Sequence, residues 1–263
     1  MSEPFRGTAL PLDQEGMAEV IDRMQVRAAE LWAVLNVETR GCGFLPDRRP
    51  LILFERHVFS RETNRQFDTS HPDISNRTAG GYGAGGAAQY ERLQRALALD
   101  RKAALRSTSW GIGQVMGFNA KIAGYADVEE MVTAMTVSES QQLLGMAGEI
   151  THNKLDRALR AHDWSAFARG YNGPKYAKNS YDTRLAAAHQ KYTLGPLPDL
   201  VVRAAQIYLS YLGYHPGPVD GVMGRFTRSA LNEFQEQHGL PITNDIDEEQ
   251  LLPLAQEAGK LPA

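Results

Sequence analysis

Apolar residues recur at intervals of three and four along most of the chain, which is the spacing of one face of an α-helix. In the stretch 28–44, Leu31, Val34 and Leu35 share such a face, and Glu38 falls on it seven residues after Leu31. The same pattern predicts helices over 12–24, 88–106, 127–135, 138–150, 154–161, 164–169, 175–192, 201–212, 226–238 and 245–258.

Glu38 is the first candidate for chemistry. Gly41 and Gly43 favour the end of its helix just beyond it, so the carboxylate lies in the last turn. An apolar setting disfavours ionisation and raises the pKa of a carboxyl group, and a general acid at neutral pH needs such a group. The alternative is an ordinary helix-end glutamate whose carboxylate reaches water.

The remaining segments have weaker patterns. Residues 51–54 form a short apolar run that predicts a strand ending at Glu55, and 62–88 reads as irregular chain. The glycine-rich run over 80–86 lacks the lysine and hydroxyl residue that follow a phosphate-binding loop. Glycines around Gln114 favour a tight turn between helices, which either only connects them or places the glutamine against a sugar.

Composition and charge narrow the class of protein. A net charge of −3 without a long basic run argues against a nucleic-acid partner. The single cysteine, Cys42, allows no disulfide within the chain, and we read it as a small buried residue. No apolar run of about 18 residues is present, and residues 1–14 carry no targeting signature, so we expect synthesis in the cytoplasm and no membrane insertion.

Metal ligation has little support in the pattern. His57, Asp68, His71 and Asp73 lie within one stretch, but their spacing fits no helical metal motif. We therefore predict no metal site and no cofactor.

A short proline-rich segment over 195–199 marks the expected domain boundary. It separates residues 1–194 from residues 199–263, where three short helices make a small module. We predict a mainly α protein with a small β element, followed by a three-helix domain that folds independently.

Three motifs occur in order: Glu38-Thr39, 111–116 (Gly-Ile-Gly-Gln-Val-Met) and 170–173 (Gly-Tyr-Asn-Gly). Together they resemble the three-part signature of the lysozyme-like superfamily, which includes goose-type lysozymes and lytic transglycosylases. Over 12–192 the chain more closely resembles phage and prophage endolysins of the N-acetylmuramidase type. Thr39 stands where serine is usual, Gly117 where proline is usual, and 172–174 (Asn-Gly-Pro) lacks the usual alanine.

The C-terminal residues resemble the type 1 peptidoglycan-binding domain. The similarity rests on Leu212-Gly213-Tyr214, Pro218-Val219-Asp220-Gly221, Gly224, Thr227, Phe234-Gln235 and His238-Gly239-Leu240-Pro241. It implies that Tyr214, Asp220 and Gly221 contribute to binding of the cell wall. The alternative is that this loop only shapes its own module.

The resemblance implies cleavage of the β-1,4 bond between N-acetylmuramic acid and N-acetylglucosamine, with Glu38 as general acid. It places Thr39, Gln114, Tyr171 and Asn172 along the sugar, although core packing is an alternative for Gln114 and Tyr171. Glu55, or else Asp73, is the expected second carboxylate in a hydrolase. For Glu55 the alternative is a structural ion pair with Arg56 or another arginine.

Other functions stay open at this point. A lytic transglycosylase would make the same cut with a 1,6-anhydro product, and a non-catalytic adaptor would only bind the wall. A peptidase is less favoured because the sequence has no metal motif and no paired nucleophile and base. We expect a monomeric, phage-encoded lysis protein whose partner is bacterial peptidoglycan, made in the host cytoplasm without a signal peptide and released through a holin-type pore.

Overall fold

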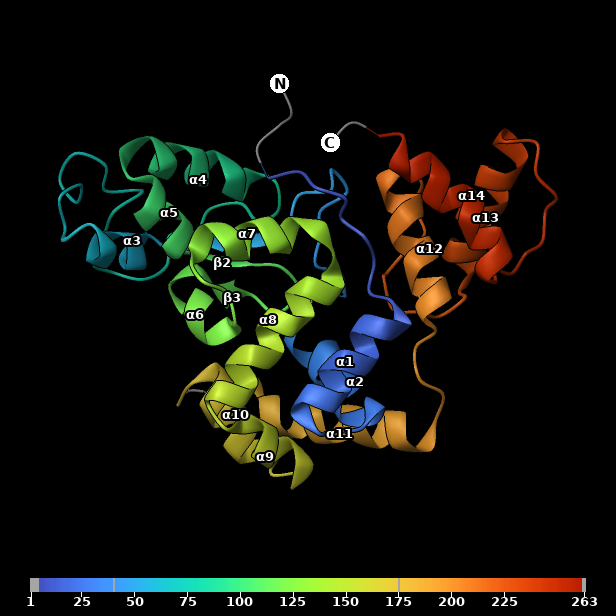
Figure 1. Cartoon of the computed structure of the whole chain (residues 1–263), viewed down its shortest axis with the longest axis horizontal. Coiled ribbons are helices and arrows are strands. Elements are labelled where there is room, and N and C mark those ends of the chain that lie inside the picture. The colour runs from blue at the N-terminus through green and yellow to red at the C-terminus, as the bar shows by residue number, and fades with distance from the viewer. Residues whose placement is uncertain (1–4, 40, 175, 262–263) are drawn as a thin grey trace.

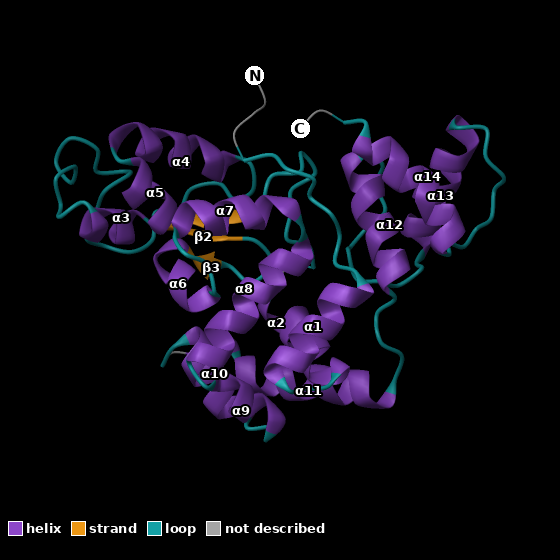
Figure 2. Cartoon of the chain, viewed as in Figure 1, coloured by secondary structure: helices purple, strands orange, loops and turns teal. Residues whose placement is uncertain are grey.

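The computed structural model describes residues 5–39, 41–174 and 176–261. The chain forms a larger body that ends with α11 (Tyr181–Leu194), and three further helices make a smaller body beside it (Figure 1). Helices dominate both bodies, and the strands lie together in the larger one (Figure 2). This confirms the predicted fold class, which is mainly helical with a small β element and a three-helix C-terminal unit.

The larger body contains most of the regular elements. Its other helices are α1 (Gln14–Met24), α2 (Ala28–Glu38), α3 (Arg56–Glu62), α4 (Ala88–Leu99), α5 (Arg101–Arg106), α6 (Ala120–Ala123), α7 (Val128–Val137), α8 (Glu139–His152), α9 (Leu155–Arg160) and α10 (Trp164–Asn172), with 3₁₀ turns η1 (Gly117–Asn119) and η2 (Tyr176–Asn179).

Helix α2 is the buried centre of the larger body. Of its residues only Asn36 is exposed, and α11 packs along it, with the rings of Trp32 and Tyr192 6.5 Å apart. The prediction of a single apolar face is therefore too simple, because the helix is covered on nearly every side. It ends at Glu38, and Thr39 is its C-terminal cap.

A three-stranded antiparallel sheet packs against α4, α5, α6 and α8. Strands β1 (Ile52–Phe54), β2 (Thr108–Trp110) and β3 (Val115–Met116) are adjacent in that order. The turn predicted over 107–119 is thus a β-hairpin. Its backbone turns back at Gly111 and Gln114, whose φ angles are +70° and +50°, and the second is unusual for a residue with a side chain.

Several predicted boundaries are wrong for local reasons. The helix predicted over 88–106 is two helices, because the side chain of Asp100 accepts a hydrogen bond from the amide of Ala103 and starts α5. The helix expected over 164–169 continues to Asn172. Position 175, the expected start of the next helix, lies outside the described residues, and the chain reaches α11 through η2.

The smaller body has a core of its own. It comprises α12 (Leu200–Tyr211), α13 (Arg225–Gln237) and α14 (Glu248–Gly259). The side chains buried in this core are Val202, Ala205, Leu209, Ala230, Leu231, Phe234, Ile246 and Leu254. Ile207 of α12 lies in a separate cluster with Ala9, Phe44, Tyr211 and Ala258, at the contact with the larger body.

A buried ion pair joins the two bodies. Arg203 of α12 contacts both carboxylate oxygens of Glu139 in α8, and the two side chains are 2% and 0% exposed. Glu139 also accepts from the amides of Leu12 and Gly43 at 2.9 and 2.8 Å, and Arg203 donates to the carbonyl of Gly41. The predicted independence of residues 199–263 must therefore be tested with this contact in view.

Candidate active site

Glu38 lies at the C-terminal end of α2, with one carboxylate oxygen bonded and one free. The side-chain amide of Asn172 donates to Oε2 at 2.7 Å, while Oε1 is buried without a hydrogen-bond partner among the described residues. Burial raises the pKa of Glu38, and the Asn172 bond and the charge of Arg184 offset this only partly. A raised pKa is what the sequence predicts for Glu38, and it favours the protonated form of the carboxyl group.

Two cavities meet at Glu38. One of about 470 Å³ is also lined by Met116, Tyr171 and Asn172, and one of about 160 Å³ is lined by Thr39 and the backbone of the sheet. Glu38 and Gln114 line both cavities. The carboxyl group therefore lies where an extended ligand would pass from one cavity into the other.

Gln114 is fixed by the hairpin that carries it. Its side-chain nitrogen donates to the carbonyls of Leu51 and Gly111, and its side-chain oxygen accepts from Ser109. Since every side-chain group is engaged, Gln114 forms a rigid part of the lining that the two cavities share. Thr39 is held in a similar way, because its hydroxyl donates to the carbonyl of Leu35 at 2.6 Å.

The C-terminal end of α10 supplies two further residues. Tyr171 donates its hydroxyl proton to the carbonyl of Gly113 at 3.0 Å, and burial with the nearby charges of Glu149 and Glu38 raises its pKa. Asn172 keeps a buried side-chain oxygen without a partner among the described residues. The structure thus brings Thr39, Gln114, Tyr171 and Asn172 to the cavities beside Glu38.

Glu149 of α8 is a carboxylate that the sequence analysis missed. It lines the 470 Å³ cavity with Glu38, accepts a hydrogen bond from Asn119, and has a pKa raised by burial. A signal was available, since Glu149 follows Met146 by three residues on a largely apolar helix. It was not recognised because α8 carries none of the three motifs.

Glu55 and Asp73 are not among the residues that line these two cavities. Glu55 accepts from the hydroxyl of Tyr82 at 3.1 Å and lies 3.0 Å from Nδ1 of His57, so among the described residues its close contacts differ from the expected ion pair with an arginine. Asp73 forms an exposed ion pair with Arg95, which lowers its pKa. The structure therefore places Asp73 in a surface ion pair and not in either cavity lining.

The expected cell-wall residues make contacts inside the smaller body. Tyr214 donates to the side chain of Gln237 at 2.7 Å, and Asp220 accepts from Gln206 at 2.9 Å. Gly221 adopts a φ of +70° beside the backbone of Asp199, where a side chain would not fit. These contacts shape the loop, and a role in cell-wall binding stays a prediction.

Comparison with known proteins gives two adjoining family matches. Residues 27–193 match the family described as N-acetylmuramidase, and residues 200–251 match one described as "Putative peptidoglycan binding domain". The chain is similar to the crystal structure of the Burkholderia AP3 phage endolysin, with a TM-score of 0.66 and 41% identity over 73% of this chain and 72% of that chain.

A local match has a different name. "Putative OxPP cycle protein OpcA" of Nostoc punctiforme is 40% identical over 55 residues, which are 21% of this chain and 12% of that protein. The N-acetylmuramidase match, in contrast, covers more than half of the chain and includes every residue around the two cavities. On this evidence the chain belongs to the N-acetylmuramidase family of glycoside hydrolases.

Proposed function

We propose that this protein is a phage endolysin that hydrolyses the β-1,4 bond between N-acetylmuramic acid and N-acetylglucosamine. The observation that carries the proposal is the position of Glu38, a buried carboxyl group with a raised pKa where two cavities meet. A glycan chain that passes through both cavities brings a glycosidic oxygen to this group. The AP3 phage endolysin, similar over most of the chain, supports the biological role.

Glu38 is the general acid in this proposal. Its proton passes to the glycosidic oxygen as the bond from that oxygen to the anomeric carbon breaks, and the sugar gains oxocarbenium character. The carboxylate left behind keeps the hydrogen bond from Asn172 at Oε2. Asn172 is therefore a positioning residue that stabilises the charged product form of Glu38.

Glu149 is the second carboxylate in this proposal, in place of Glu55 and Asp73. It lines the same cavity as Glu38, and Tyr171 lies near the carboxyl groups of both glutamates. In its ionised form Glu149 orients a water molecule and accepts a proton as the water oxygen bonds to the anomeric carbon. The raised pKa makes it a stronger base than an exposed glutamate.

Product analysis tests the reaction. Digestion of purified sacculi should release muropeptides with reducing ends, as hydrolysis by water requires. Products with 1,6-anhydro ends would overturn hydrolysis, because they form when the substrate's own 6-hydroxyl attacks and no second carboxylate is needed.

Replacement of Glu149 tests its role. Glu149→Gln keeps the shape of the side chain and should lower kcat by about 10²-fold with little change in KM, the loss expected for a general base. Glu91→Gln, an exposed change in α4, is the matched control. Parental kinetics for Glu149→Gln would exclude this group as the base.

The smaller body is proposed to bind peptidoglycan without cutting it. The family match over 200–251 supports this binding, with Tyr214, Asp220 and Gly221 as the proposed contact loop. No helix among the described residues could span a bilayer. A pull-down of the isolated fragment 199–263 with sacculi tests the binding, and a fragment that folds but stays in the supernatant would contradict it.

A further inference from the structure

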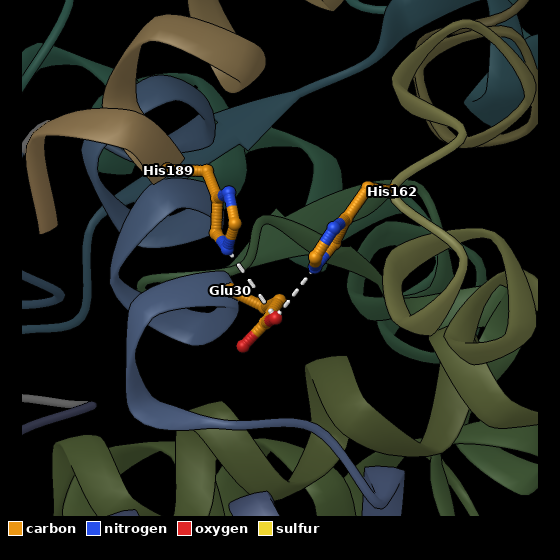
Figure 3. A group of neighbouring side chains, drawn as sticks. All are labelled: Glu30, His162 and His189. Carbon is orange, nitrogen blue, oxygen red and sulfur yellow. Dashed lines mark hydrogen bonds and ion pairs between the residues drawn. The ribbon is translucent and has the colours of Figure 1, made fainter. Parts of the chain in front are cut away.

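Three side chains outside the two cavities converge on one point of the larger body. Figure 3 shows the imidazole rings of His162 and His189 directed at the same carboxylate oxygen of Glu30. The distances from Oε1 of Glu30 are 2.7 Å to Nε2 of His162 and 3.3 Å to Nε2 of His189. These ligand atoms all lie within 4.8 Å of one another.

The surrounding residues hold this arrangement in place. Oε2 of Glu30 accepts from the amide of Arg27 at 3.0 Å, a helix-capping bond that leaves Oε1 for the two histidines. The ring of Trp164 is stacked on His162 at 5.4 Å and lies 5.1 Å from the ring of His189. The backbone therefore fixes the carboxylate, and the indole limits the orientation of both imidazoles.

We propose that Glu30, His162 and His189 form a binding site for a divalent transition-metal ion, with Zn²⁺ as the best-fitting ion. Two imidazoles and one carboxylate are common ligands of such ions, and a site with three protein ligands leaves a fourth position for water. Bonds of about 2.0–2.2 Å in a tetrahedron place ligand atoms about 3.3–3.5 Å apart. The contact of 3.3 Å from Glu30 to His189 already matches this spacing, and the contact of 2.7 Å from Glu30 to His162 is shorter than it.

Access and charge agree with an ion at this position. The side chain of His162 is 44% exposed, so an ion can enter from solvent, while that of Glu30 is 5% exposed. Burial opposes ionisation of Glu30, but the hydrogen bonds from His162 and the helix cap outweigh it and lower its pKa. A lowered pKa favours the ionised form of the carboxylate, which is the form that binds a metal ion.

The bound ion would connect the helices around the candidate site. Glu30 is in α2, which ends at Glu38; His162 precedes α10, which ends at Asn172; and His189 is in α11. An ion held by all three segments would resist their separation. This site is independent of the catalytic proposal above.

The test uses the untagged full-length chain, stripped with a chelator. Titration with Zn²⁺ should reveal one saturable site per chain, and Co²⁺ should give a visible absorption spectrum typical of a low-coordinate site. Saturation with Zn²⁺ should raise Tm by about 5 °C, since a ligand at a hundredfold its Kd stabilises the folded state measurably. Absence of a saturable site in the parental protein would overturn the proposal.

Matched histidine variants locate the site. His162→Gln and His189→Gln should each weaken Zn²⁺ binding at least about tenfold and remove the Co²⁺ spectrum. His152→Gln, at an exposed position of α8, should change neither. His162 is partly exposed, so its variant should fold as the parent does, which far-UV circular dichroism checks. Unchanged affinity in the folded His162→Gln variant would place the ion elsewhere and overturn the assignment.

Discussion

The candidate active site and the junction between the two bodies each bury a carboxylate, and the pKa values of the two groups are shifted in opposite directions. At Glu38 burial dominates and the pKa is raised, because the nearest partner is the neutral amide of Asn172. At Glu139 burial is stronger, yet the pKa is lowered by the charge and hydrogen bonds of Arg203 and by two backbone amides. Both carboxylates lie away from bulk water, so burial alone does not decide their charge.

The difference lies in the partner. An amide donor compensates only part of the lost hydration, so the pKa of Glu38 stays raised, which favours the protonated form that the proposed general acid needs. A guanidinium with two hydrogen bonds compensates far more, so Glu139 stays charged and connects α8 to α12. The same residue type is thus the proposed acid in one region and a member of a buried ion pair in the other.

The largest effect on activity is expected when the proton of Glu38 is removed by substitution. Glu38→Gln keeps the shape of the side chain and should lower the rate of cell-wall lysis by about 10²-fold or more, the scale of lost general-acid catalysis. Binding to sacculi and Tm should stay close to the parental values. Turbidity assays on permeabilised Gram-negative cells measure the rate, and lysis at the parental rate would exclude Glu38 as the acid.

Removal of the Arg203 guanidinium from the junction should make the protein less stable. Arg203→Met leaves the carboxylate of Glu139 buried without its ion pair, and breaking such a pair typically lowers the free energy of unfolding by about 3–5 kcal/mol. Denaturant titration measures this change. The double variant Arg203→Met with Glu139→Leu should recover much of the loss, because it removes the orphaned charge as well. A single variant as stable as the parent would mean that the pair is unimportant, and equal losses in the single and double variants would mean that the orphaned charge is not the cause.

Truncation after residue 194 separates the two regions. We expect cleavage of short soluble glycans to persist and activity on intact sacculi to fall about tenfold or more, because the tethered binder no longer raises the local concentration of enzyme. The truncated chain should carry Glu139→Leu, so that lost stability is not mistaken for lost binding. Equal losses on both substrates would make the smaller body a structural part of the catalytic unit.

Activity and stability should depend on pH in opposite directions, because the pKa of Glu38 is raised and that of Glu139 is lowered. Activity needs protonated Glu38, so it should fall as pH rises through the raised pKa of that group. The stability supplied by Glu139 is present above the ordinary glutamate pKa of about 4.3 and is lost as pH falls through its lowered value. Alkaline inactivation should therefore occur without unfolding, whereas acid should loosen the junction.

A variant of Asn172 sharpens this comparison. Asn172→Leu removes the donor that favours ionised Glu38, so the alkaline limb of the kcat/KM profile should move to higher pH. The rate below the limb should also fall, since the carboxyl group loses its positioning bond. A limb that moves downward would contradict the role assigned to Asn172.

The smallest effect is expected at Glu55. Its partners Tyr82 and His57 lie outside the two cavities, so Glu55→Gln should change kcat by less than about threefold and lower Tm slightly. Kinetics and thermal unfolding on the same preparation distinguish a catalytic role of Glu55 from a structural one. A loss near 10²-fold in kcat would return Glu55 to the catalytic list in place of Glu149.

The sequence by itself determined the helical fold class, the place of Glu38 at a helix end and the three-helix form of the C-terminal unit. These features depend on local patterns, because apolar spacing and caps act within a few residues. The grouping of Gln114, Tyr171 and Asn172 near Glu38 was expected only through family resemblance. No local rule brings α2, the hairpin and α10 together.

The tertiary structure decided which carboxylates matter and how. Glu149 joins Glu38 across more than one hundred residues of chain, and Arg203 reaches Glu139 from the other body. Glu30 likewise meets two histidines that follow it far along the chain. Burial and partner charge set the state of each of these groups, and both are properties of packing between distant segments, which no spacing in the sequence encodes.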